Sequence, residues 1–188
     1  MEATVGCALM DGAPPDQVSL DPVLRLRPFR MEDEQAARAA HVAMRADEFP
    51  FLLDYVAGEP WSLYLRRREA NRRGEQLPAR WVPSTFLAAT VTGALVGRIS
   101  IRHELNGWLE TFGGHIGYAV IPSMRRRGYA TEILRQGLVI ARAVGVDDVL
   151  VTCDVGNAAS AGVIEACGGV FESIAEGDGP PKRRYWFR

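Results

Sequence analysis

The chain has 188 residues, 47% of them hydrophobic and 24% charged, a balance typical of one globular domain with a sizeable core. Its formal net charge of -1 gives no overall field that would draw it to nucleic acid or to an acidic membrane. No apolar run is long enough to span a bilayer and no cleavable signal is evident, so we expect a cytoplasmic protein without a membrane partner. Cys7, Cys153 and Cys167 lack metal-ligand spacing, which predicts reduced thiols, no metal site and no catalytic cysteine.

The N-terminal part predicts an extension followed by a strand and two helices. Residues 1–21 are rich in Gly, Pro and Asp without a sustained period, which predicts a mobile extension before a single domain at 22–188. An alternating strand is expected at Leu24–Arg30, then a helix from Glu32 to Arg45 with a weak apolar side. A second helix, from Trp61 to Arg73, carries arginines that we interpret as a solvated face. The apolar side of the first helix is assigned to Ala36, Ala40, Val42 and Ala43.

The middle of the chain predicts antiparallel strands. Two strand-like runs, Ser84–Val91 and Ala94–Arg102, are joined by Thr92-Gly93, which is a tight hairpin signal. After a further turn comes an apolar strand at His115–Ile121, which ends at Pro122 because proline offers no backbone donor to a sheet.

The last third alternates helix and strand. Apolar residues three or four apart predict a helix from about Tyr129 to Val144, and Gly145 suits a left-handed cap at its end. A buried strand is expected at Asp147–Cys153, and Arg183–Phe187 alternates well enough to close the sheet. Antiparallel strands followed by a parallel strand-helix-strand unit predict a mixed α/β sheet with helices on both faces.

The turn before the Tyr129 helix has the features of an anion site. It carries Arg125, Arg126 and Arg127, and Gly128 follows them. Free N–H groups at a helix N-terminus favour a phosphate or pyrophosphate, and Gly128 lets the backbone approach it. The alternative is an exposed basic turn without a ligand. Neither the Gly-Lys-Ser/Thr ending of a nucleotide P-loop nor the spacing of a dinucleotide fingerprint is present.

The pattern Arg125-x-x-Gly128-x-Ala130 after Val120-x-Pro122 resembles the acyl-CoA pyrophosphate loop of the GNAT superfamily of N-acetyltransferases. The strand Gly113-Gly-His-Ile-Gly-Tyr118 is similar to one found in a group of predicted acetyltransferases.

A second motif supports the same superfamily. Asn157, Ser160 and Gly168 fall where it has an Asn at a strand end, a small residue three positions on, and a Gly before the next strand. Asn157 could alternatively serve as a helix cap, and the two roles are compatible. The resemblance implies a GNAT-like acyl-CoA N-acyltransferase fold and acetyl-CoA as co-substrate, with no metal.

The same resemblance implies where acetyl-CoA binds. Strands at 115–121 and 149–154 would part to admit its pantetheine arm, and the arginine turn would hold its pyrophosphate. The implied contacts are Ala119, Val120, Ile121, Arg125, Arg126, Arg127, Gly128, Tyr129, Ala130, Thr131, Asn157 and Ser160.

Proton transfer is less defined by the sequence. Many members use a glutamate early on the first parted strand, whereas this chain offers His115, which can titrate near neutral pH or be a hydrogen-bonded strand residue. Glu104 and Glu110 are the alternative bases. The tyrosine that often protonates the leaving thiolate corresponds here to Ile164, and we assign that role to neither of the nearby tyrosines.

Two functions follow. The first is an N-acetyltransferase that moves an acetyl group from acetyl-CoA to a primary amine of a small molecule or peptide by direct attack. The second is a non-catalytic module that binds or senses acyl-CoA. By resemblance, the acidic and aromatic segment 48–59 would wall the amine side, where its carboxylates would suit a cationic acceptor, or it is a solvated acidic loop. No nucleic-acid partner is expected, and a homodimer stays open.

Overall fold

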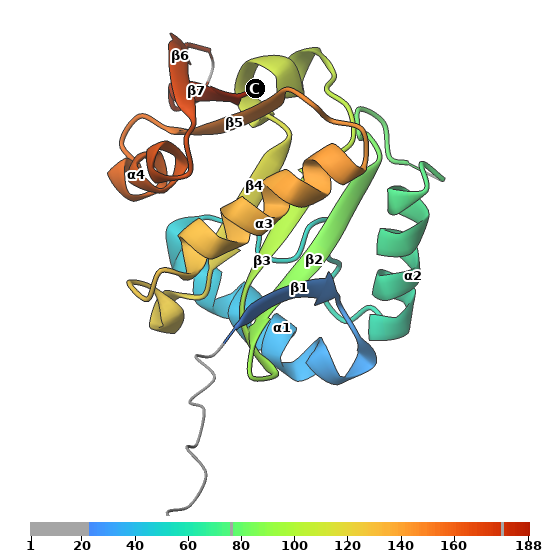
Figure 1. The fold of residues 1–188 in the computed structure, drawn as a ribbon. Coiled ribbons are helices and arrows are strands. Elements are labelled where there is room, and N and C mark those ends of the chain that lie inside the picture. The colour runs from blue at the N-terminus through green and yellow to red at the C-terminus, as the bar shows by residue number, and fades with distance from the viewer. Residues whose placement is uncertain (1–22, 76, 178) are drawn as a thin grey trace, which may run out of the picture.

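The computed structural model describes residues 23–75, 77–177 and 179–188, so the predicted extension at 1–21 lies outside the described residues. Within these ranges, seven strands form one sheet in the order β1-β2-β3-β4-β5-β7-β6 (Figure 1). The β4–β5 pair is parallel and the other described pairs are antiparallel. The predicted mixed α/β sheet is therefore confirmed.

Most elements lie close to their predicted positions. The strands are β1 Leu24–Pro28, β2 Ser84–Val91, β3 Ala94–Arg102, β4 Ile116–Val120, β5 Val149–Asp154, β6 Val170–Ala175 and β7 Lys182–Phe187. The α-helices are α1 Glu34–Ala43, α2 Trp61–Arg72, α3 Tyr129–Ala143 and α4 Ala158–Ala166. Short helical turns lie at Met31–Asp33, Met44–Asp47, Leu109–Gly113 and Pro122–Met124. None of the helices in the described ranges is long and apolar enough to cross a membrane.

Helix α3 covers one face of the sheet (Figure 1). Its fully buried Ile133 and Leu134 belong to a core shared with Ile99 of β3 and Ile116 of β4. Gly137 lets the helix approach closely, because a Cβ added there would lie 2.2 Å from the Cδ1 atom of Ile99. The predicted period of this helix is confirmed, and Gly145 has the left-handed φ of 92° expected just past its end.

Helices α1 and α2 pack on the opposite face, where Phe51, Trp61 and Tyr64 are buried. The predicted apolar side of α1 is confirmed at Ala40 but was wrong at Ala36, Val42 and Ala43, which are exposed. The buried side is formed by Ala37, Ala40 and Met44, because residues three and seven positions apart share one face of a helix.

The arginines of the second helix form the predicted solvated face only in part, because Arg66, Arg72 and Arg73 are exposed whereas Arg68 is buried. Arg68 is 7% exposed, and its guanidinium lies over the rings of Tyr64 and Trp81, at 5.4 and 5.2 Å from their centroids. The reason is that the acidic segment folds against this helix, with Asp54 3.3 Å from Arg68. Opposite charges from distant parts of the chain thus permit burial of an arginine.

Candidate active site

Strands β4 and β5 are tightly joined where they begin and separate further along. Their parallel register comprises a single pair, Ile116 with Val151. Just before it, the backbone N–H of His115 donates to the carbonyl oxygen of Leu150 at 2.7 Å. Since β4 still pairs with β3 as far as Val120, its other edge is left without a strand partner beyond Ile116.

A cleft of about 900 Å³ lies at this opening. It is lined by every predicted acetyl-CoA contact except Ile121 and Arg127, together with residues from the end of α1 and from α4. The lining residues are Met44, Asp47, Phe49, Tyr118, Ala119, Val120, Met124, Arg125, Arg126, Gly128, Tyr129, Ala130, Thr131, Asp154, Asn157, Ala158, Ala159, Ser160, Gly162 and Val163.

The N-terminus of α3 opens into this cleft with unpaired backbone donors. Arg126 and Gly128 adopt left-handed φ angles of 63° and 77°, which turn successive amides of the loop toward the same side. Within the described residues, the amide groups of residues 126–131 donate to no protein acceptor. Such a ring of N–H groups, reinforced by the helix dipole, fits a pyrophosphate.

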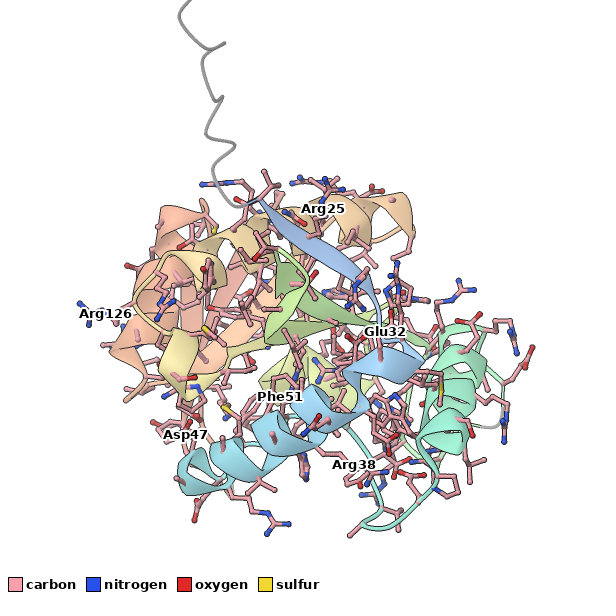
Figure 2. All side chains as sticks on the ribbon, turned by 90° about the horizontal axis from the view of Figure 1, so that it is seen from below. Arg25, Glu32, Arg38, Asp47, Phe51 and Arg126 are labelled. Carbon is pink, nitrogen blue, oxygen red and sulfur yellow. The ribbon has the colours of Figure 1, made fainter. Side chains whose placement is uncertain are left out.

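The three arginines of the turn have different surroundings. Arg125 forms an ion pair with Asp47, in the helical turn that follows α1, and its Nε donates to the carbonyl oxygen of Val120 at 3.3 Å. Arg127 points to the carbonyl oxygen of Ser123 at 3.5 Å. Figure 2 shows Arg126 projecting from the outside of the turn, on the same side of the molecule as Asp47. Arg126 is exposed and forms no ion pair with any described residue, so its charge is available to an anion.

Helix α4 contributes two polar residues to the opposite wall. Asn157 is the N-cap of the helix, and its Oδ1 accepts from the backbone N–H of Ser160 at 3.0 Å. The capping alternative for Asn157 is therefore confirmed, and the same residue also lines the cleft.

Tyr118 is a polar group of the cleft for which no role was predicted from the sequence. Its hydroxyl lies 3.0 Å from Oγ of Ser160, and burial raises its pKa to about 12. Ile164, at the position of the superfamily's usual tyrosine, is fully buried in the core. The alternation of β4 puts the side chains of Tyr118 and Ala119 on opposite faces of the strand, and only the separation of β4 from β5 reveals that the Tyr118 hydroxyl reaches α4.

None of the three predicted bases lines this cleft. His115 is 8% exposed, and its Nδ1 accepts from the backbone N–H of Leu150 at 2.9 Å. Burial, with a smaller contribution from the nearby Arg102 charge, lowers the pKa of His115 to about 4. Glu104 and Glu110 are exposed beyond the end of β3.

Arg98 links the cleft to the segment between α1 and α2. This side chain is 2% exposed and donates to the carbonyl oxygens of Pro50, Phe51 and Gly117 at 3.0, 3.1 and 2.9 Å. The ring of Phe49 lies 4.7 Å from its guanidinium carbon. In Figure 2, Phe51 lies in the interior, between α1 and the sheet. Arg98 thus holds this segment against β4.

These features define an acyl-CoA acetyltransferase fold, and the comparisons identify its family. The family model described as acetyltransferase (GNAT) domain matches residues 24–170, so the chain belongs to this family of acetyltransferases. The predicted superfamily is thereby confirmed, while the narrower group with the Gly-Gly-His-Ile-Gly-Tyr strand remains a prediction.

Solved structures share the fold at low sequence identity. An acetyltransferase from Agrobacterium tumefaciens is 22% identical, with 97% of this chain and 99% of that chain covered and a TM-score of 0.62. RimJ of Mycobacterium smegmatis, in complex with CoA-disulfide, is 22% identical, with 88% and 82% covered and a TM-score of 0.65. YncA of Salmonella typhimurium, with acetyl-CoA, is 14% identical, with 88% and 93% covered and a TM-score of 0.58. No curated protein matches the chain.

Proposed function

We propose that this protein transfers an acetyl group from acetyl-CoA to a primary amine by direct attack. The observation that carries the proposal is the cleft between the parted strands β4 and β5, which joins the unpaired amides of α3 to the Tyr118–Ser160 pair. Family membership supports acetyl transfer, and the complexes of YncA with acetyl-CoA and of RimJ with CoA-disulfide support the donor.

The residues of the cleft fit this donor. The amides of residues 126–131 and the side chain of Arg126 would hold the pyrophosphate. The unpaired edge of β4 beyond Ile116 would bond the amides of the pantetheine arm. Acetyl-CoA supplies a thioester, whose carbonyl carbon is open to attack by an amine.

Tyr118 is the proposed proton donor to the leaving thiolate. The amine nitrogen forms a bond to the acetyl carbon, the carbon–sulfur bond breaks, the sulfur takes the hydroxyl proton of Tyr118, and water then returns a proton to the Tyr118 oxygen. A pKa of about 12 means that Tyr118 carries its proton at neutral pH, and Ser160 orients the hydroxyl.

The proton of the amine, we propose, leaves to water rather than to His115. An imidazole with a pKa of about 4 is a weak base at neutral pH, and its Nδ1 already accepts a bond from Leu150. The pH profile of kcat/KM should therefore be the same in wild type and in His115→Asn. A profile flattened by the substitution would return the role of base to His115, and Glu104→Gln and Glu110→Gln test the other two candidates in the same assay.

The decisive experiment separates binding from turnover. Isothermal titration with desulfo-CoA reports binding, and release of free thiol from acetyl-CoA over a panel of amines and peptides reports transfer. Tyr118→Phe should lower kcat by about 100-fold and leave the Kd for desulfo-CoA unchanged. Tyr185→Phe is the matched control. The Tyr185 hydroxyl donates a hydrogen bond to Glu165 at 2.9 Å, and neither residue lines the cleft. Equal kcat values for the two variants would refute the role of Tyr118.

The sensing module is the weaker alternative. The feature that favoured it was an apolar residue at Ile164, and the hydroxyl of Tyr118 now supplies a donor within the cleft. Binding of desulfo-CoA without thiol release for any amine or peptide would support the sensing module and overturn the transferase.

A further inference from the structure

A second cavity, of about 760 Å³, lies on the α2 side of the sheet. Its floor includes Ser100 and Arg102 of β3, and its walls include Leu53, Trp81 and Trp108. It shares no residue with the donor cleft. The cavity is therefore a separate compartment with a polar floor and largely apolar walls.

This second cavity adjoins the place where the acetyl group would be delivered. Ser100 on its floor is the cross-strand partner of Gly117 in β4. Gly117 precedes Ala119 of the donor cleft by two positions, which is about 7 Å along a strand. A molecule in the second cavity would thus reach β4 from the face opposite α3.

Arg102 is a guanidinium held in place without an acidic partner. Its Nη1 donates to the carbonyl oxygens of Gly113 and Gly114 at 3.1 and 2.8 Å. No carboxylate of the described residues forms an ion pair with it, and its Nε and Nη2 have no acceptor in the same part of the chain. The Nε and Nη2 atoms of Arg102 are both accessible to solvent. Burial lowers the pKa of Arg102 only to about 10, so it is a cation at neutral pH.

The charges around the cavity are positive. Its lining contains Arg80 and Arg102 and no acidic residue. The carboxylates of the acidic segment point elsewhere, because Asp54 and Glu59 both pair with Arg67 of α2, at 3.2 and 2.8 Å. The expectation that this segment would offer free carboxylates to a cationic acceptor therefore fails for Asp54 and Glu59, whose charges are paired within the protein.

We infer that this cavity is the acceptor subsite and that it takes a small amine that also carries a carboxylate and an apolar body. The Nε–Nη2 edge of Arg102 is a two-donor fork that matches the two oxygens of a carboxylate. Arg102 is half-buried and has no counterion, and an anionic ligand would compensate its charge. Trp81 and Trp108 supply apolar surface for the body of the ligand. This inference rests on the proposed acetyl transfer and names its substrate class.

The test compares matched acceptors that differ at the carboxylate. Phenylalanine, leucine and tryptophan are each assayed beside the corresponding amino-acid amide and decarboxylated amine, with thiol release as the readout. Wild type should prefer the acids over the amides by at least about tenfold in kcat/KM, equal to about 1.4 kcal/mol. Binding of the same compounds in the presence of desulfo-CoA, followed by calorimetry, gives the order of affinity without turnover.

Substitution of Arg102 assigns the preference to its side chain. Arg102→Gln should abolish the preference for acids while leaving transfer to the amides, and Arg102→Lys should restore part of it. Arg66→Gln is the control and should keep the preference, because this exposed arginine of α2 lines neither cavity. A retained melting temperature and an unchanged Kd for desulfo-CoA establish that each variant is folded.

Failure of the inference about Arg102 and failure of the proposed acetyl transfer would give different results. If wild type binds and acetylates the amides or decarboxylated amines as well as the acids, the inference about Arg102 is overturned and acetyl transfer stands. If none of these compounds is acetylated although desulfo-CoA binds, the wider panel of amines and peptides decides whether the transferase stands, and the calorimetric order of affinity decides separately whether the cavity selects a carboxylate.

Discussion

At the junction of β4 and β5, the side chain of His115 accepts a hydrogen bond from the backbone N–H of Leu150. The bond from Leu150 to its Nδ1 exists only when that atom is unprotonated. The pKa of His115 is lowered from 6.5 to about 4 in the folded protein, so the unfolded chain binds the proton at higher pH. The free energy of unfolding is unaffected by this group above pH 6.5, and it should fall by about 3 kcal/mol between pH 6.5 and 4.

The substitution His115→Asn removes this titration and keeps an oxygen acceptor for Leu150. Urea unfolding at several pH values should show a shallower loss of stability in the variant than in wild type below pH 6.5. His41 and His103 also have lowered pKa values, and the difference between wild type and variant isolates His115 from them. Identical pH slopes would contradict the role given to its Nδ1.

The two ends of helix α3 provide a matched pair of glycines. Gly128 and Gly145 have φ angles of 77° and 92°, and an added Cβ at either would meet nothing within 4 Å. An alanine at either position should therefore cost about 1–2 kcal/mol of stability through its backbone conformation. Gly128→Ala should in addition weaken desulfo-CoA binding by at least about tenfold, because its methyl group lies at the anion site. Equal affinities of the two variants in titration calorimetry would show that the loop does not hold the ligand.

A second pair of glycines tests how α3 packs on the sheet. Gly137→Ala would place a Cβ 2.2 Å from Cδ1 of the fully buried Ile99, so we expect a loss of about 1–3 kcal/mol. Gly162→Ala within α4 meets no atom within 4 Å and should stabilise by up to about 1 kcal/mol. Chemical denaturation measures the free energy of unfolding of both variants. An unchanged value for Gly137→Ala would mean that Ile99 and its neighbours can move to accommodate the methyl group.

The elements were predictable where the signal is local. The regular apolar spacing of α3 and the cap at Gly145 depend on neighbours in sequence, and both are confirmed. The insertion of β7 between β5 and β6 depends on long-range pairing, which alternation at Arg183–Phe187 does not encode. Arg68 is buried because Asp54 folds against it, and a run of arginines gives no sign of that.

The candidate site was likewise predictable only where a local sequence pattern defines it. The turn before α3 has a short pattern tied to backbone geometry, so its residues could be named from the sequence, and they line the cleft apart from Arg127. The proposed roles of Tyr118 and Arg102 were not predicted, because each depends on segments distant in sequence that pack beside its strand. The distance from Tyr118 to Ser160 arises from two segments far apart in the chain.

At the scale of the whole molecule, the two cavities permit both substrates to be bound together. They have separate linings, so initial-rate plots against acetyl-CoA and amine should intersect, as expected for a ternary complex. Burial raises the pKa of the Cys153 thiol, which makes it a poor nucleophile at neutral pH. Incubation with acetyl-CoA alone should therefore leave the mass of the protein unchanged. Parallel plots together with an acetylated protein would contradict direct attack.

The three carbonyl bonds of Arg98 have a consequence for redesign of the enzyme. This side chain spans β4 and the segment at Pro50 and Phe51, so any change that widens the space between them breaks several bonds of one buried cation. Libraries that aim at larger or differently shaped amines should keep Arg98 and its carbonyl partners constant. Substitutions should instead be made at Trp108, because this side chain lines the second cavity and is 63% exposed.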